Sequence, residues 1–211
     1  MARLNIAPTK SSQLTLKADL AVVTEGHSLL DQKREILVME MMRLLERVRT
    51  AQRKLDTVQA AAMAALRRAM ARNGYHQTRN IASSARFQHH AKVQSQIVAG
   101  VRIPRITVEH SPFAPQFGLA SSDSLLDETM FCFAELTKAV GEMAELETAV
   151  WLLARDLKKT QRRVNALEQI FIPDYRETLR YISETLESKE LEAFSLMKIV
   201  KRRTVDKRKK S

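Results

Sequence analysis

One apolar stripe runs along the first third of the chain and constrains the fold more than any other feature. Alternate steps of four and three residues from Leu16 to Ala69 pass through sixteen positions, and fourteen of them are apolar. Only His27 and Arg34 interrupt the stripe. A strict seven-residue repeat of this length is typical of a left-handed coiled coil. Besides its alanines, we expect the following residues in the seam: Leu16, Leu20, Val23, Leu30, Leu37, Met41, Leu44, Val48, Leu55 and Val58.

Capping and stop residues predict where this helix begins and ends. Thr9 or Ser11 can serve as an N-cap, because a hydroxyl oxygen accepts a hydrogen bond from a free N–H of the first turn. The pair Asn73–Gly74 is a favourable helix end. A helix between these points has about 65 residues and spans about 100 Å. The low content of glycine and proline, five of each in 211 residues, also favours long helices over a turn-rich fold.

The last third repeats the apolar pattern with slips in register. Asp123 or Ser124 can cap a helix there, and we expect Val164, Leu167 and Phe171 in its seam. Pro173 lies inside the run and lacks a backbone N–H, so we expect it to bend or break the helix.

The middle of the chain has a different period. Apolar residues alternate with others between Ile97 and Val108, which predicts short strands and one β-hairpin. Pro104 restricts that stretch to an edge or a bend. The segment 111–122 is expected to be a loop.

A single heptad helix cannot bury its own stripe, but two such helices joined by a compact middle can pack on each other. The expected fold is therefore predominantly α-helical. It is a long antiparallel two-helix coiled-coil hairpin with a small head that contains a short β-hairpin. The expected parts are an N-terminal coiled-coil helix at 9–73, a head at 74–122, a C-terminal coiled-coil helix at 123–201 and a basic tail at 202–211.

Residue chemistry gives little indication of an enzyme. The chain has no Gly-x-x-x-x-Gly-Lys-Ser/Thr phosphate loop, and its five histidines lack metal-ligand spacing. The single cysteine, Cys132, is flanked by phenylalanines and fits a buried apolar position better than a nucleophile. We expect no catalytic residue, no cofactor and no metal.

The net charge of +11 is concentrated at the C-terminus, from Lys198 onward. One interpretation of this run is an arm for nucleic acid or an acidic partner, and the other is a solvated, partly disordered terminus. The second is favoured over nucleic-acid binding, because no aromatic residues are interleaved to stack on bases. No apolar run approaches the length of a membrane span, and no signal peptide is expected.

Three sequence blocks together resemble the D subunit of the V-type and archaeal-type ATPases. The first block contains Gly26, His27, Lys33 and Arg34, and the second is the run from Gly100 to Pro104. The third contains Arg162, Arg163, Asn165 and Pro173. The resemblance extends over about residues 8–203.

This resemblance implies a non-catalytic central stalk, the rotor shaft of the complex. Such a shaft transmits rotation between the nucleotide-hydrolysing hexamer and the ion-translocating membrane ring, in ATP synthesis or in ATP-driven proton or sodium transport. The implied partners are the small F subunit of the central stalk, the catalytic and regulatory subunits of the hexamer, and the funnel-shaped subunit above the ring. The implied location is cytoplasmic and peripheral to the membrane, with no nucleic acid bound.

The residues alone are also compatible with two other classes of protein. One is a coiled-coil adaptor or export-apparatus chaperone outside the ATPase, which would not require the block around Asn165. The other is a basic helical protein that binds nucleic acid, whose affinity would fall steeply with salt.

Overall fold

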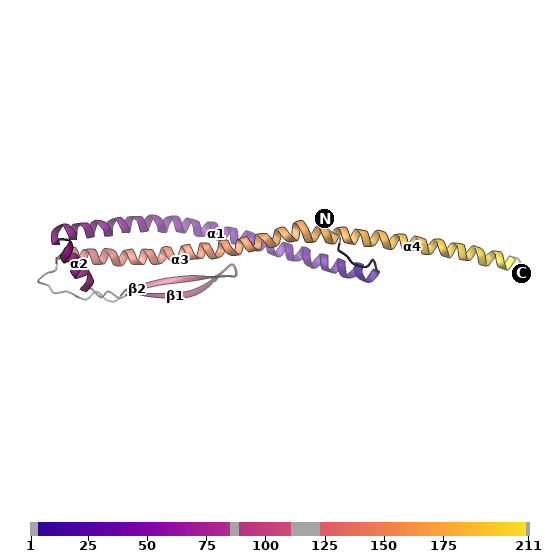
Figure 1. Ribbon diagram of the computed structural model, residues 1–211, viewed down its shortest axis with the longest axis horizontal. Helices are drawn as coiled ribbons and strands as arrows, with labels where there is room; N and C mark the ends of the chain where they lie inside the picture. Colours follow the sequence, from indigo (N-terminus) through magenta and orange to yellow (C-terminus); the bar gives the residue numbers. More distant parts are fainter. Residues whose placement is uncertain (1–3, 85–88, 111–122, 210–211) are drawn as a thin grey trace. The chain divides into compact units, whose positions relative to one another are not determined.

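The computed structural model describes residues 4–84, 89–110 and 123–209, with side chains described at 4–84, 90–109 and 123–202. The loop expected at 111–122 lies outside the described residues. The predicted fold class is confirmed: long helices pair in an antiparallel manner, and one β-hairpin lies between them in sequence (Figure 1). The elements in chain order are α1 (Lys10–Asn73), α2 (Tyr75–Ser84), β1 (His89–Val98), β2 (Val101–His110), α3 (Ser124–Ala166), the π-helix η2 (Leu167–Phe171) and α4 (Ile172–Lys209).

Helix α1 begins and ends where its capping residues predict. The Thr9 hydroxyl accepts a hydrogen bond from the Ser12 backbone N–H at 3.1 Å, which satisfies one free donor of the first turn. At the other end, Gly74 has a φ of 75°, a left-handed conformation that terminates helices and costs glycine little. The short helix α2 follows directly and was not predicted from the sequence.

The C-terminal helix continues through Pro173, so of the bend or break expected there, a break is not observed. The turn before it widens into η2, in which the Ile172 N–H donates to the Leu167 carbonyl five residues back. A proline in a regular α-helix clashes with the carbonyl four residues before it, and a π-turn just ahead shifts that carbonyl. The helix then continues as α4 to Lys209, so the expected boundary between helix and basic tail at 201–202 is not a break in the backbone.

The chain divides into two compact units, residues 1–34 with 159–211 and residues 35–158. Both boundaries fall inside long helices and not at the limits of the expected head. Each unit has its own buried side chains and is described separately below.

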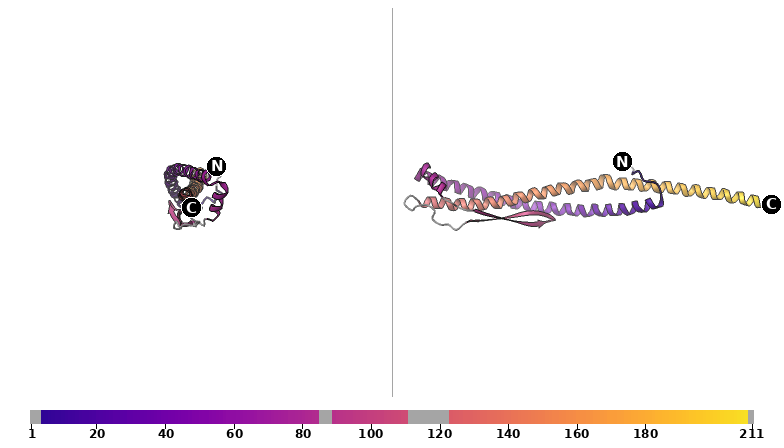
Figure 2. Two further views of the ribbon diagram at one scale, coloured as in Figure 1. Left: turned by 90° about the vertical axis from the view of Figure 1, so that its left-hand side faces the viewer. Right: turned by 60° about the horizontal axis from the view of Figure 1, so that its bottom comes forward.

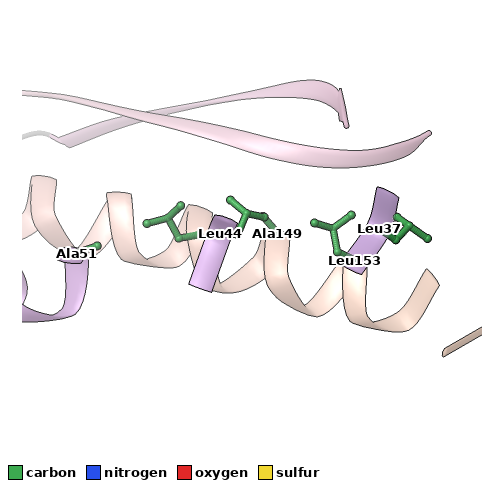
Figure 3. Close-up of a cluster of buried hydrophobic side chains, with 6 residues drawn as sticks. Leu37, Leu44, Ala51, Ala149 and Leu153 are labelled. Carbon is green, nitrogen blue, oxygen red and sulfur yellow. The ribbon is translucent and has the colours of Figure 1, made fainter. Parts of the chain in front are cut away.

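The unit at 35–158 is built on an antiparallel pair of helices. Leu37, Leu44 and Ala51 of α1 pack against Leu146, Ala149 and Leu153 of α3 in one buried cluster (Figure 3). Three ion pairs flank the seam, and their acidic partners lie in α3 or, for Asp123, directly before it. The partner's number falls as the α1 number rises, as expected for antiparallel packing: Lys54–Glu142 at 2.8 Å, Arg68–Glu128 at 2.7 Å and Arg72–Asp123 at 2.8 Å.

Toward the far end of this pair, the buried residues become small. Ala62, Ala65 and Ala69 of α1 are buried, as are Ala134 and Ala139 of α3. Small side chains let two helix backbones approach closely.

The unit that contains both ends of the chain pairs the first part of α1 with η2 and α4 (Figure 1). Leu16, Val164 and Ile182 are buried in it. The segment before α1 is attached to α4 by a hydrogen bond from the Leu4 N–H to the buried Thr178 hydroxyl, at 3.2 Å. The Thr178 hydroxyl in turn donates to the Asp174 carbonyl, so both of its hydrogen-bonding functions are used.

The β-hairpin is longer than the sequence pattern predicts. Its antiparallel register pairs His89 with His110 at the open end and Val98 with Val101 beside the turn. The turn residues Ala99 and Gly100 both have positive φ, 50° and 80°, which matches a two-residue type I′ turn. Alanine in this conformation is strained by about 1 kcal/mol, because its Cβ crowds the backbone.

Replacing Ala99 with Asn is expected to stabilise the hairpin, because Asn–Gly is the favoured pair for a type I′ turn. We expect the free energy of unfolding to rise by about 0.5–1 kcal/mol in denaturant titrations. Ala99→Val is the opposite control, since a β-branched residue suits positive φ poorly. Equal stability of the two variants would contradict the turn assignment.

Candidate functional site

Two surfaces stand out as places where this chain can act on other chains: the docked β-hairpin and the end of α4. The hairpin lies along α3 within its unit (Figures 1 and 2). Near the turn, Ala99, Val101 and Ile103 pack against the buried cluster of α1 and α3. The hairpin is therefore held in place by the same core that joins the two helices.

Farther from the turn, two residues of α3 receive β2. The Glu145 carboxylate accepts a hydrogen bond from the Ile106 backbone N–H at 2.6 Å. One turn earlier stands Gly141, where an added Cβ would overlap Cγ2 of Val108. A glycine inside a helix lowers its stability by about 1 kcal/mol relative to alanine. Here its absent side chain makes room for the strand.

The hydrogen-bond alternation of the hairpin explains why β2 can carry Pro104 and meet Glu145. A two-residue turn is closed by a hydrogen-bonded pair, here Val98 with Val101, and bonded and non-bonded pairs then alternate. Pro104 and Ile106 consequently fall in non-bonded pairs, where the backbone nitrogen points away from β1. Proline removes no ladder bond at such a position, and the Ile106 N–H is free to reach Glu145.

The close approach at Gly141 predicts a coupling that a double-mutant cycle can measure. Gly141→Ala is expected to displace β2, and the overlap with the stiff Val108 side chain should outweigh the gain in helix propensity. In the double variant with Val108→Ala, the new Cβ would lie 3.7 Å from the Cβ of residue 108, an ordinary contact. We expect a coupling energy of about 1–2 kcal/mol from chemical denaturation, with the double variant more stable than Gly141→Ala alone. Additive effects would contradict the docked position of β2.

The second surface is the end of α4. Seven of the ten residues from Leu191 to Val200 are apolar, and only Glu192, Ser195 and Lys198 are polar. At 3.6 residues per turn, the seven apolar residues point in all directions around the helix axis. All residues from 187 to 202 are exposed, and the large apolar ones in the segment are 46–64% exposed. A helix that is apolar all round is normally buried on every side.

An ion pair lies just before this apolar segment. The Lys10 ammonium group meets the Glu190 carboxylate at 2.6 Å, and this hydrogen bond and charge raise the pKa of Lys10. Both groups are strongly exposed, so the pair contributes little to stability. Within the apolar segment, the Lys198 ammonium lies 4.7 Å from the centre of the Phe194 ring.

The expected seam residues differ in how deeply they are buried. Leu16, Leu37, Leu44 and Val164 are buried, whereas a second group is partly buried: Leu20, Val23, Leu30, Met41, Val48, Leu55, Val58 and Leu167. Phe171 is 48% exposed, so its expected place in the seam is wrong. The π-turn η2 explains this difference, because one extra residue in the turn rotates the helix and brings Ile172 to the buried side instead.

The residues of the two helical signature blocks lie on different kinds of surface. Gly26, His27, Lys33 and Arg34 are partly buried on one face of α1, since Gly26–Lys33 and His27–Arg34 are each seven residues apart. Arg34 forms an ion pair with Asp31 one turn before it.

In the third block, Arg162, Arg163 and Asn165 are exposed, and Pro173 is partly buried. Asn165 accepts a hydrogen bond from Gln161 on the same helix at 2.8 Å. These exposed polar groups are available to other chains.

Comparison with known proteins identifies the family. The sequence profile of the ATP synthase D subunit family matches residues 12–202. The chain belongs to this family. Among its curated relatives, the D subunit of the A-type ATP synthase of Methanosarcina mazei is 32% identical over 209 residues, covering 98% of this chain and 100% of the relative. The D subunit of the V-type ATP synthase of Thermotoga neapolitana is 31% identical, covering 94% of this chain and 98% of the relative.

Membership of the D subunit family makes the chain a component of an A/V-type ATP synthase. Family membership therefore favours an ATP synthase subunit over an adaptor protein outside the ATPase. Within the described ranges, no helix combines the length and the apolar character needed to cross a membrane.

Sequence reasoning missed three features of the two surfaces. A glycine inside an otherwise uninterrupted helix, Gly141, was the available sign of a close approach by another element. Glu145, four residues later, lies on the same face. The all-round apolar character of 191–200 could have been found by plotting the residues around a helix, in place of following one stripe.

Proposed function

We propose that this chain is the non-catalytic central stalk of an A/V-type ATP synthase. In this role it transmits rotation between the nucleotide-binding hexamer and the membrane ion-translocating ring, in ATP synthesis or in ATP-driven proton or sodium transport. It would be peripheral to the membrane, on its cytoplasmic side. The proposed partners are the F subunit of the central stalk, the catalytic and regulatory subunits, and the funnel-shaped subunit above the ring.

The observation that carries the proposal is the apolar character of α4 on all sides between Leu191 and Val200. An exposed stripe on one side would suit a single partner, whereas exposure on every side suits a helix that is enclosed by several chains. A stalk end inside a ring of subunits is such an environment. The D subunit family supplies the assembly in which a ring of subunits is expected.

The paired helices also suit a rotating element. An antiparallel helix pair resists bending, and the hairpin docked beside α3 makes its unit unequal around the helix axes. An element that turns inside three catalytic sites must present a different face to each of them, because it can bias their conformations only through differential contacts.

The proposal is tested by omission. The subunits of the source organism's ATP synthase are co-expressed with and without this chain, and ATP hydrolysis and ATP-driven ion uptake into vesicles are measured. We expect that without the chain, ion uptake is lost, while the nucleotide-binding subunits can still be recovered. Full ion uptake without the chain would refute the proposal. Recovery of the chain only in a complex with other proteins would favour the adaptor function.

A further inference from the structure

Strand β1 is the most exposed regular element of its unit. Every described residue from His90 to Ile97 is exposed, including Val93 and Ile97, whose side chains are each 66% exposed. Within the described residues the sheet has two strands, so β1 has one paired edge and one open edge there. The opposite strand, β2, turns its own outer edge toward α3 through Ile106 and Val108.

The open edge of β1 carries backbone groups that are arranged for pairing. The alternation that directs the Ile106 N–H away from β1 also directs the N–H groups of its β1 counterparts away from β2. These outward groups belong to Ala91, Val93, Ser95 and Ile97. A row of free N–H and C=O groups at this spacing is a template for a further strand.

The two edges of the hairpin are protected very differently. On β2, Pro104 has no N–H to offer and Glu145 accepts the N–H of Ile106. On β1, no proline is present from 89 to 98, and the one charged residue is Lys92. Its ammonium group lies 3.6 Å from the Glu109 carboxylate on the neighbouring strand. Long edges without such protection are usually covered in the working protein.

The charge of the hairpin indicates what kind of strand can cover it. Arg102 lies opposite Ile97 and Arg105 lies opposite Gln94, one on each face of the ribbon. Both are exposed, and within the described residues neither has an ion-pair partner. A second copy of this chain would bring the same positive charges together, on a protein of net charge +11. An acidic segment would instead be attracted on both faces.

We propose that β1 receives an extended acidic segment of a neighbouring subunit as a third strand of this sheet. Backbone hydrogen bonds from Ala91, Val93, Ser95 and Ile97 would hold the segment. Val93 and Ile97 would contact its apolar side chains, and Arg102 and Arg105 would bind its carboxylates. This inference rests on the proposed function, because the partner is another subunit of the assembled complex.

Amide hydrogen exchange tests the pairing in the assembled ATP synthase against the isolated chain. We expect the amides of Ala91, Val93, Ser95 and Ile97 to exchange at least about tenfold more slowly in the complex. The amides of Gln94 and Gln96 face β2 and should change much less. Failure of the chain to enter the complex would overturn the proposed function and this inference together. Entry without slower exchange at the four amides would overturn the inference alone.

A proline variant separates strand pairing from simple burial. Ser95→Pro removes an outward N–H opposite Pro104, at a position where the hairpin ladder loses no bond. We expect the slow exchange of Val93 and Ile97 in the complex to be lost, while Ser95→Ala, which keeps the N–H, retains it. Retained protection in Ser95→Pro would contradict a third strand.

A charge reversal tests the chemistry of the partner. In Arg102→Glu/Arg105→Glu, the protection at β1 should fall by about tenfold or more. The control variant Arg53→Glu/Arg79→Glu makes the same change of charge at exposed positions elsewhere in the unit. It should retain the slow amide exchange at β1. Equal protection in both variants would refute an acidic partner. Protection that grows with the concentration of the isolated chain would show self-pairing and would also refute the proposal.

Discussion

A chain with Leu44 replaced by Asp is expected to lose most of the stability of the unit at 35–158. Leu44 is 7% exposed and lies in the cluster that joins α1 to α3 (Figure 3). The substitution removes a buried leucine, which costs about 2–5 kcal/mol even for truncation to alanine. It also introduces a carboxylate with no cation in the cluster to pair with. Thermal unfolding followed by circular dichroism should show a lower midpoint and a loss of helix at 25 °C.

Met42→Asp is the matched control for this variant. Met42 lies two residues away on the same helix and is 60% exposed. The helix propensity changes similarly in both variants, so the difference in their stability reports the burial of the side chain at position 44. We expect Met42→Asp to change stability by less than about 1 kcal/mol. Similar melting curves for the two variants would contradict the assignment of Leu44 to the seam.

The second large effect is expected on assembly and not on the stability of the free chain. Leu191→Asp, Leu196→Asp and Met197→Asp each place a carboxylate in the apolar segment of α4. The three positions lie on three different sides of the helix, because each residue advances the direction by about 100°. If the segment is enclosed on every side, each variant removes a burial of about 1.5–3 kcal/mol and adds the cost of burying a charge. We therefore expect each variant to weaken incorporation into the complex by at least about tenfold.

The free chain provides the first control, because these side chains are already exposed in it. Its melting temperature should change by no more than about 2 °C in all three variants. Ser188→Asp supplies the same charge on the same helix before the apolar segment, and it should assemble normally. If only one of the three variants weakens assembly, the segment has a partner on one side and enclosure is refuted.

Local patterns predicted the long helices well, for identifiable reasons. Three signals identified α1: the heptad from Leu16 to Ala69, the Thr9 cap and the left-handed Gly74. Each of them depends only on residues that are close together in the sequence. Such short-range effects are present in the sequence regardless of what the helix packs against. The position of the β-turn was not predicted, because Ala99 and Gly100 fit the alternation of residues on either side of them.

The sheet was harder to predict because alternation records a difference in burial between two faces. Residues 90–97 are exposed on both faces, so the apolar residues Ala91, Val93 and Ile97, which alternate with polar ones, do not mark a buried face. Strand β1 is instead held by its pairing with β2, which starts with Val98 and Val101 beside the turn and continues to the open end of the hairpin. The seam position of Phe171 failed for a related reason, because a heptad count assumes a constant turn and η2 adds a residue to one turn.

The sequence by itself determined the helical fold class, the extent of α1 and the apolar face on which its partner packs. It did so because hydrophobic periodicity and capping are properties of a few neighbouring residues. Only the tertiary structure decided that β2 docks at Gly141 and Glu145, that β1 keeps an open edge and that α4 continues past Pro173. Each of these depends on which distant backbone approaches a residue, and no local pattern encodes the position of an element that lies far away in the chain.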